Sequence, residues 1–299
     1  MGKIVAVVVT YNRSNLLVEC VEALMNSGTA TDILVIDNAS TDNTHEVIAP
    51  YIDNKKIFYF NTGKNLGGAG GFHYGIRKAY EMGYDYFWIM DDDTIVHRDS
   101  LEEILKVADQ HEKEFGFISS LALWTDGSEC RMNFHYIADD WNMVKKTLND
   151  GVLKISGATF VSFFIRRAVV EDVGLPIKEY FIWGDDTEFS QRISKKYHCY
   201  LAFRSQVTHK MSSNDLTSEY YTFTDKARIE RMFYSIRNDC CTYKRMGIKR
   251  FRRFVMQYLR MLKKVMFYKD VPYRGKKVRV LMKGMVQGLL FHPRIELVN

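Results

Sequence analysis

Short apolar runs alternate with amphipathic stretches along the first half of the chain. Ile4–Val9 has the length of a buried strand, and apolar residues recur at helical spacing over Ser14–Asn26. The same alternation predicts strands at Ile33–Ile36, Lys56–Phe60 and Tyr84–Met90, and helices at Asp42–Tyr51, Gly70–Met82 and from Ser100 to about Glu112. This order predicts an α/β fold with a doubly wound, mostly parallel sheet.

The pattern is less regular beyond residue 115. We expect a helix at Asp185–Lys196, and strands at Phe115–Leu123 and Ala158–Ile165 (with a hairpin between them), Tyr200–Arg204 and Val207–His209. From Lys226 the chain is predicted to be helical to its end, with breaks near Gly247, Pro272 and Pro293. We therefore predict a mixed sheet in a domain of residues 1–225, followed by a helical region of residues 226–299.

Three acids, Asp91, Asp92 and Asp93, directly follow the apolar run Tyr86–Met90. Three like charges at a strand end repel one another unless a cation lies among them. Mg²⁺ and Mn²⁺ prefer carboxylate oxygens and keep open positions for a diphosphate. The triplet therefore indicates chemistry on a phosphate ester or a nucleotide-sugar.

Polar residues also follow the first two predicted strands. Arg13 can offset the charge of a diphosphate, and Asp37 can accept hydrogen bonds from a uracil N–H or a ribose hydroxyl. Taken alone, such residues are ordinary in turns and helix caps, as are Ser40 and Asp42. Together with the acidic triplet they favour a nucleotide site.

The stretch Asn65–Phe72 contains four glycines in five positions before a predicted helix. Such a stretch lets the backbone approach a ligand where free N–H groups favour anions. It is not a dinucleotide-binding fingerprint, because the G-x-G-x-x-G spacing fails at His73 and the stretch follows the third strand instead of the first.

Two further groups carry candidate chemistry. Asp185 and Asp186 begin a predicted helix, whose N-terminus favours ionised acids, and a catalytic base must be ionised. Trp183 is suited to stacking on a sugar ring. His209 ends a predicted strand and is a candidate metal ligand, although a lone histidine is more often structural.

Charge is unevenly distributed along the chain. Residues 244–283 hold fifteen Lys and Arg against one acid, a net charge of +14, whereas residues 1–243 carry a net charge of −8. Apolar residues lie between these cations, mostly on one helical face: Phe251, Phe254, Val255, Tyr258, Leu259, Leu262, Val265, Met266 and Phe267. This pattern predicts a basic helix on an anionic membrane surface and favours that partner over nucleic acid. In the alternative, the apolar stripe packs on the preceding domain.

The five cysteines show no metal-binding spacing, and no apolar run approaches the roughly 20 residues of a spanning helix. No secretory signal is visible. These features indicate reduced thiols in a cytoplasmic protein, soluble or peripheral on the inner face of the cell membrane. The oligomeric state is left open.

The motifs together resemble the family 2 glycosyltransferases of the GT-A fold, over roughly residues 1–215. The match follows the order and spacing of Val8–Arg13, Asp37–Asp42, Asn65–Gly68 and Asp91–Asp93. The stretch Asn65–Phe72, the acids after Trp183 and the later His209 are similar to the bacterial galactofuranosyltransferase and rhamnosyltransferase branch. In those galactofuranosyltransferases Trp directly precedes the two acids, whereas Gly184 intervenes here.

The resemblance implies a role for each candidate residue. Asp91, Asp93 and His209 would bind Mn²⁺ or Mg²⁺, and Asp186 would be the general base. Residues that would line the nucleotide or its sugar are Thr10, Arg13, Asp37, Asn65 and Asp92. Residues that would lie near the acceptor are Trp183 and Asp185.

The implied activity is inverting transfer of a sugar from a nucleotide donor to a hydroxyl of a glycan or lipid-linked glycan, in bacterial cell-surface polysaccharide synthesis. UDP-galactofuranose is the first expected donor, and dTDP-rhamnose is the alternative.

Three other classes fit less well. A haloacid-dehalogenase-type phosphohydrolase would use Asp91-x-Asp93 as its nucleophile motif, but that motif normally follows the first strand of its domain. A nucleotidyltransferase would need a glycine-rich loop near the first strand, which is absent. A non-catalytic sugar- or lipid-binding adaptor is disfavoured by the intact set of acids.

Overall fold

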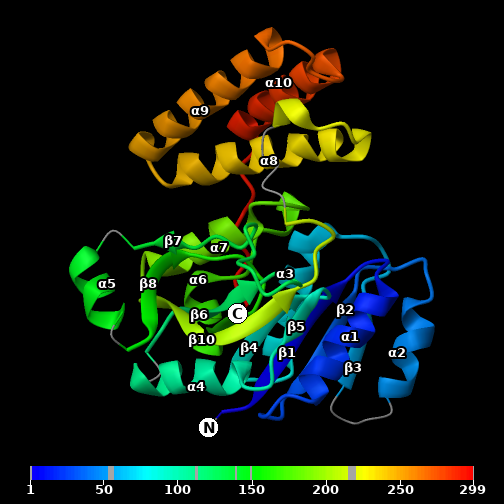
Figure 1. Ribbon diagram of the computed structural model, residues 1–299, viewed down its shortest axis with the longest axis vertical. Helices are drawn as coiled ribbons and strands as arrows, with labels where there is room; N and C mark the ends of the chain where they lie inside the picture. The colour runs from blue at the N-terminus through cyan, green and yellow to red at the C-terminus, as the bar shows by residue number, and fades with distance from the viewer. Residues whose placement is uncertain are drawn as a thin grey trace. The chain divides into compact units, whose positions relative to one another are not determined.

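The computed structural model of the chain describes residues 2–52, 57–111, 114–138, 140–148, 150–214 and 220–298 (Figure 1). They form two units. The first comprises the chain up to Lys178, Asp186–Asn214 and the chain from Ile295, and the second comprises Glu179–Asp185 and residues 220–294. The second unit thus includes a short segment from before the expected boundary at residue 226. The function assigned to each region stays a prediction.

Four parallel strands form one half of the sheet in the first unit. They are β1 (Ile4–Thr10), β2 (Asp32–Asp37), β3 (Ile57–Asn61) and β4 (Tyr86–Asp91), in the spatial order β3-β2-β1-β4. Strand order reverses at β1, since β2 lies on one side of it and β4 on the other. Ligands of such sheets bind beyond the carboxyl ends of the strands at this point.

The other half of the sheet is mixed. Its strands are β5 (Thr94–Val96), β6 (Phe117–Leu123), β7 (Tyr136–Ile137), β8 (Val152–Gly157), β9 (Phe163–Arg166) and β10 (Cys199–His209). The order continues from β4 as β9-β6-β10-β8-β7, with β5 paired to β10. Among these pairs β6 and β10 are parallel, while the others are antiparallel. The expected mixed α/β sheet is confirmed.

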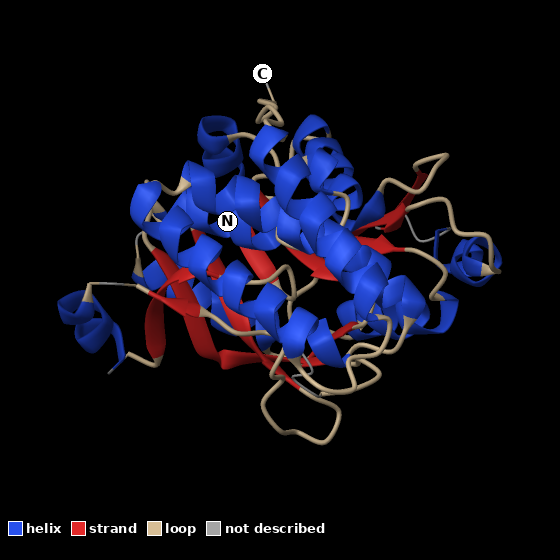
Figure 2. Cartoon of the chain, turned by 90° about the horizontal axis from the view of Figure 1, so that it is seen from above, coloured by secondary structure: helices blue, strands red, loops and turns tan. Residues whose placement is uncertain are grey.

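Helices cover both faces of this sheet. One face is covered by three helices, α1 (Ser14–Met25), α2 (Thr44–Ile52) and α4 (Ser100–Gln110). Each contributes a side chain to the core on this face: Leu17, Ile48 and Ile104. The opposite face is covered by α3 (Gly67–Glu81), α6 (Arg167–Val173) and α7 (Asp185–Ser194). Ile76 of α3 and Phe189 of α7 belong to the core on that face. A short helix, α5 (Trp141–Leu148), precedes β8. Figure 2 shows the strands in red among these helices in blue.

Several expected boundaries are corrected. The strand expected at Ala158–Ile165 is only β9. The stretch before it contains the expected antiparallel pairing, as a bridge between Leu123 and Glu129 and as the pair β7 and β8, which α5 connects. The two strands expected between Tyr200 and His209 are one strand, β10, whose register shifts between Ala202 and Gln206. Lys56 and Glu112, predicted ends of a strand and a helix, lie outside the described residues.

The second unit contains three long helices, α8 (Lys226–Arg245), α9 (Ile248–Phe267) and α10 (Arg274–Leu290). The predicted breaks at Gly247 and Pro272 are confirmed. The prediction of helix to the end of the chain is wrong, because α10 ends at Leu290 and residues 291–298 are not helical. Ile236, Val265 and Leu281 are buried in a core of this unit. The apolar stripe predicted on α9 therefore packs partly within the helical unit. No helix among the described residues combines the length and the apolar character needed to cross a bilayer.

The chain after α10 returns to the first unit. Leu175 N donates to the carbonyl of Glu296, and the carboxylate of Glu296 pairs with Arg77 and Lys178 at 2.7 and 2.6 Å. These contacts join the end of the chain to the segment between α6 and α7. All five cysteines are free thiols, as expected.

Candidate active site

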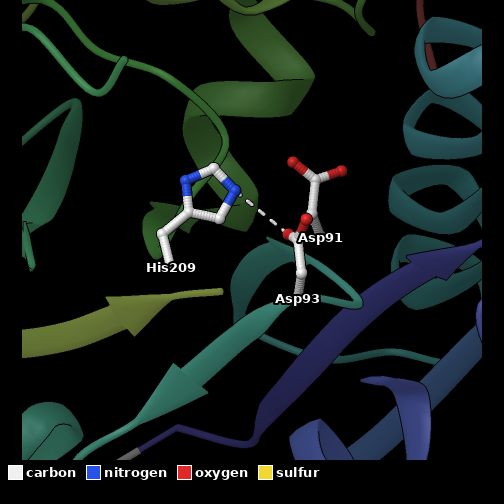
Figure 3. Close-up of side chains that lie close together, drawn as sticks. All are labelled: Asp91, Asp93 and His209. Atoms are coloured by element: carbon white, nitrogen blue, oxygen red, sulfur yellow. Dashed lines mark ion pairs between the residues drawn. The ribbon is translucent and has the colours of Figure 1, made fainter. Parts of the chain in front are cut away.

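Asp91, Asp93 and His209 converge at one edge of the sheet, with one ligand atom of each within 4.8 Å of the others. Asp91 ends β4, and Asp93 lies in the turn that leads into β5. Because Thr94 of β5 pairs with His209 of β10, this turn brings Asp93 beside the imidazole. Figure 3 shows Nε2 of His209 pointing toward Asp93, 3.1 Å from its Oδ1, with the carboxylate of Asp91 alongside.

Burial and mutual charge govern the protonation of this cluster. Burial, together with the charge of Asp93, raises the pKa of Asp91. Burial also favours neutral Asp93, but His209 and Arg13 outweigh it and lower the pKa of Asp93. Burial lowers the pKa of His209, but Asp93 outweighs it and raises that pKa to about 10. The protonated form is therefore favoured for Asp91, and the charged form for Asp93 and His209.

These residues fit a divalent cation. Although Nε2 of His209 is nearby, Asp93 Oδ1 is a buried oxygen without a hydrogen-bond partner in the described structure. Two carboxylates and one imidazole are suitable ligands for Mn²⁺, and carboxylates alone suit Mg²⁺. The cluster Asp91–Asp93–His209 is therefore a candidate metal centre.

Thr10 and Arg13 contact the same acidic turn. The Thr10 hydroxyl donates to Asp92 at 2.7 Å, and Nη1 of Arg13 donates to Asp92 and Asp93 at 3.2 and 2.7 Å. Burial raises the pKa of Asp92 to about 6 against the opposing effects of Arg13 and Thr10. Half of the Arg13 side chain is exposed, so its guanidinium reaches from the buried acids to the surface. Three predicted nucleotide-site residues are thus gathered beside the candidate metal centre.

Asp37 and Asn65 make mainly local contacts. The buried carboxylate of Asp37 accepts hydrogen bonds from the Ser40 backbone and the Tyr59 hydroxyl. The exposed Asn65 accepts a hydrogen bond from Gly67 N at the start of α3. Their predicted contacts with a nucleotide stay predictions.

The glycine-rich stretch brings α3 close to the sheet. A Cβ at Gly71 would lie 2.5 Å from Val9 Cγ1, and a Cβ at Gly75 would lie 2.6 Å from Val7 Cγ1. These two glycines therefore allow helix–sheet packing. At Gly68, by contrast, an added Cβ would meet no atom within 4 Å, so this position leaves room for the ligand approach predicted from the sequence.

The predicted base lies at the N-terminus of α7. Burial raises the pKa of Asp186, whose Oδ1 accepts a hydrogen bond from Thr187 N. Asp185 is 7% exposed. Trp183 belongs to the second unit, where its ring faces the Arg231 guanidinium at 5.6 Å. The candidate base, Asp186, belongs to the first unit, as does the metal cluster.

Two asparagines that the sequence did not indicate form hydrogen bonds to candidate site residues or to the segment that precedes them. Asn133 Oδ1 accepts a 2.7 Å hydrogen bond from His209 Nδ1. The side-chain amide of Asn238, fully buried in α8, donates to three carbonyls of the segment before Asp185. Both contacts join residues far apart in the chain, so no local motif signals them.

Comparison with known proteins identifies the family of the chain. The model of the family described as "Glycosyl transferase family 2" matches residues 5–174. Galactofuranosyltransferase GlfT1 of Mycolicibacterium smegmatis is 28% identical over 207 residues, which cover 63% of this chain and 64% of that protein. The match thus spans less than two thirds of this relative.

Solved structures share the fold at low sequence identity. TarS of S. aureus, in complex with UDP, has a TM-score of 0.61 at 13% identity, over 90% of this chain and 76% of that one. The mannosyltransferase PcManGT of Pyrobaculum calidifontis, in complex with GDP-Man and Mn²⁺, has a TM-score of 0.57 at 13% identity, over 98% and 76%. These matches give the phosphohydrolase alternative no support. With the GT-A sheet, the acidic turn and a family match over more than half its length, the chain belongs to glycosyltransferase family 2.

Proposed function

We propose that this enzyme is a metal-dependent, inverting hexosyltransferase that moves galactofuranose from UDP-galactofuranose to a hydroxyl of a glycan or lipid-linked glycan. The observation that carries the proposal is the cluster of Asp91, Asp93 and His209, joined through the acidic turn to Thr10 and Arg13. The galactofuranosyltransferase relative supports the sugar, and UDP in the TarS complex supports the nucleotide.

The metal would be Mn²⁺ or Mg²⁺, held by Asp91, Asp93 and His209. Mn²⁺ in the mannosyltransferase complex supports this assignment. When bound, the ion neutralises charge on the departing diphosphate. Arg13 adds a fixed positive charge beside the same turn. Residues assigned to the nucleotide and its sugar are Thr10, Arg13, Asp37, Asn65 and Asp92.

Asp186 would be the general base. It accepts the proton of the acceptor hydroxyl as that oxygen attacks the anomeric carbon from the face opposite the diphosphate, which inverts the configuration. The transition state resembles an oxocarbenium ion, as in glycosidases. Burial raises the pKa of Asp186 toward the range in which a base works at neutral pH. Asp185 and Trp183 would lie near the acceptor.

Asn133 should tune metal affinity through His209. By accepting from Nδ1, it leaves Nε2 free to face the carboxylates, and second-shell partners of this kind change metal affinity about 10–100-fold. We expect Asn133→Leu to weaken Mn²⁺ binding by about that factor in calorimetry. The matched control is Thr159→Val, which removes only the hydroxyl that accepts from Asn133 Nδ2. Equal Mn²⁺ affinity in wild type and Asn133→Leu would contradict the assignment.

Metal affinity should rise with pH. The pKa of His209 is raised to about 10 and that of Asp91 is also raised, so both hold protons near pH 7 in the metal-free protein. Mn²⁺ must displace these protons, and each one displaced strengthens binding up to about tenfold per pH unit. Calorimetry at about pH 6.5 and about pH 8.5 measures the effect. Affinity that is flat or falls with pH would show that these groups are not ligands.

Asn238 should control the segment that presents the base. Its amide donates to Tyr180 O, Ile182 O and Trp183 O at 3.0, 3.1 and 2.7 Å, and φ is positive at Phe181 (65°) and Trp183 (66°). Such backbone costs about 1–3 kcal/mol per residue and persists only when held. We expect Asn238→Ala to lower kcat about tenfold or more with donor KM unchanged.

The control for Asn238 is Thr242→Ala, in the same helix. It removes a buried hydroxyl that forms a hydrogen bond with the Tyr180 hydroxyl. Both variants should lose stability, but only Asn238→Ala should lose kcat. A Tm decrease in Asn238→Ala without a change in kcat would mean that the amide has a structural role alone.

Donor choice is tested by incubating the enzyme and Mn²⁺ with UDP-galactofuranose or with dTDP-rhamnose. Nucleotide release and the mass of product on a synthetic lipid-linked glycan are then measured. Galactofuranose transfer is the expected result. Rhamnose transfer would favour the alternative donor, dTDP-rhamnose, for which the nucleotide site must have room for the methyl group of thymine.

We infer that the enzyme acts in bacterial cell-surface polysaccharide synthesis, at the cytoplasmic face of the cell membrane, where a lipid-linked acceptor would be available. We assign catalysis to residues 1–225 and association with the membrane or acceptor to residues 226–299. The basic composition of the second region supports this division.

A further inference from the structure

The outward face of α10 carries an apolar stripe. Packing of this helix on α8 is set by Gly284 and Gly288, where a Cβ would lie 3.0 Å from Ile236 Cβ and 2.5 Å from Cys240 Cβ. The opposite face is therefore turned outward. It carries three apolar side chains at i, i+3 and i+4 that are 46–75% exposed: Val286, Leu289 and Leu290.

The outward face of α9 is also partly apolar. Phe254, Tyr258 and Val265 are buried, which fixes the inner side of the helix. Large apolar side chains that point away from them and are 50–70% exposed are Met256, Leu259 and Phe267. Exposed apolar residues scattered singly need no explanation, but a group of them at helical spacing on α9, and another on α10, indicates helix faces that are covered in use.

Cations and no acids accompany these apolar groups. Neither α9 nor α10 contains an acidic residue. Exposed cations of the two helices include Lys249, Arg252, Arg253, Arg260, Lys263, Arg279 and Lys283. A partner that contacts these faces must therefore offer negative charge and an apolar layer together.

We propose that the outward faces of α9 and α10 dock on the surface of an anionic phospholipid bilayer. Headgroup phosphates would pair with the cations while the apolar side chains enter the boundary between headgroups and acyl chains. Nucleic acid supplies the charge but no apolar layer. A second copy would bring two faces of like charge together, which repel. Docking on the bilayer would give the enzyme access to a lipid-linked acceptor, and this use of the surface rests on the proposed function.

Vesicle co-sedimentation of the full chain tests the proposal. Vesicles of phosphatidylcholine alone are compared with vesicles that also contain phosphatidylglycerol. We expect binding to the anionic vesicles that weakens as salt rises. Leu289→Gln/Leu290→Gln should lower partitioning about tenfold or more, by removing buried apolar area. Arg252→Gln/Arg253→Gln should also lower it about tenfold or more, since each cation near an anionic surface strengthens binding about fivefold.

Matched controls are double variants of exposed residues in the first unit, Lys145→Gln/Lys146→Gln and Met25→Gln/Ile137→Gln, which should bind as the wild type does. UDP binding is measured for every variant. If UDP binding is kept and vesicle binding is absent, or equal on both vesicles, the docking proposal fails while the proposed function stands. Tighter binding to single-stranded RNA than to vesicles would also overturn it, as would a dimer in light scattering that Leu289→Gln/Leu290→Gln dissociates.

Discussion

Replacing Asp91 and Asp93 by asparagine should remove metal-dependent activity. The two carboxylates are the charged ligands of the candidate centre, and His209 alone cannot hold Mn²⁺ or Mg²⁺ at useful affinity. A bound metal contributes several kcal/mol to stabilising a leaving diphosphate, and each ~1.4 kcal/mol is a tenfold change in rate. We therefore expect kcat/KM of the double variant to fall by at least about 10³-fold.

The single variant Asp91→Asn should keep its fold. Burial and the neighbouring Asp93 raise the pKa of Asp91, so its charged form is unfavourable in the metal-free protein. Asp91 therefore holds a proton near pH 7, and Asp91→Asn replaces a neutral carboxyl with a neutral amide of the same shape, so the Tm of this single variant in EDTA should stay close to that of the wild type. The matched control is Asp85→Asn, an exposed carboxylate just before β4, which should keep full activity. Mn²⁺-dependent transfer by the folded double variant would exclude these acids as ligands.

Asp186→Asn should lower kcat by about 10²–10⁴-fold, the usual effect of losing a general base. The asparagine cannot accept the acceptor's proton, although it keeps the shape of the side chain. Binding of UDP and of Mn²⁺ should stay within about twofold, because the residue is assigned to the acceptor side of the reaction. Kinetics with saturating donor, together with calorimetry, separate the two effects.

The pH profile adds a second readout for Asp186. Burial raises its pKa, so the deprotonated base becomes more populated as pH rises, and wild-type kcat should increase through that range. This limb should be absent in Asp186→Asn. Asp185→Asn serves as the comparison, since it removes the adjacent carboxylate. A larger loss of kcat in Asp185→Asn than in Asp186→Asn would exchange the roles of the two acids.

Periodicity and strand-end chemistry predicted the parallel half of the sheet, β3-β2-β1-β4. Long apolar runs such as Ile4–Val9 predict buried strands, and parallel strands deliver their polar ends to one edge. This is why Thr10 and the acidic triplet could be expected to lie together. Thr10 and Asp92 are 82 residues apart in the chain, and a hydrogen bond joins their side chains. Short elements such as β5, three residues long, leave too little pattern to detect.

Other features depend on tertiary contacts. Two predicted strands are one strand, β10, because the shift in register between Ala202 and Gln206 interrupts the sequence pattern without ending the strand. The apolar residues of α9 divide between a buried face and an exposed one, and composition alone cannot tell them apart. Asn133 and Asn238 resemble any loop or helix asparagine until the fold places them against His209 and the segment before Asp185.

Calorimetric titration of the full chain with UDP and with dTDP, each in Mn²⁺ and in EDTA, tests the central claim most directly. A metal-dependent nucleotide-sugar transferase should bind UDP in Mn²⁺, lose that binding in EDTA and lose it in Asp91→Asn/Asp93→Asn. Stronger binding of UDP than of dTDP would support the galactofuranose donor. Failure of the folded protein to bind either nucleotide in Mn²⁺ would contradict the account.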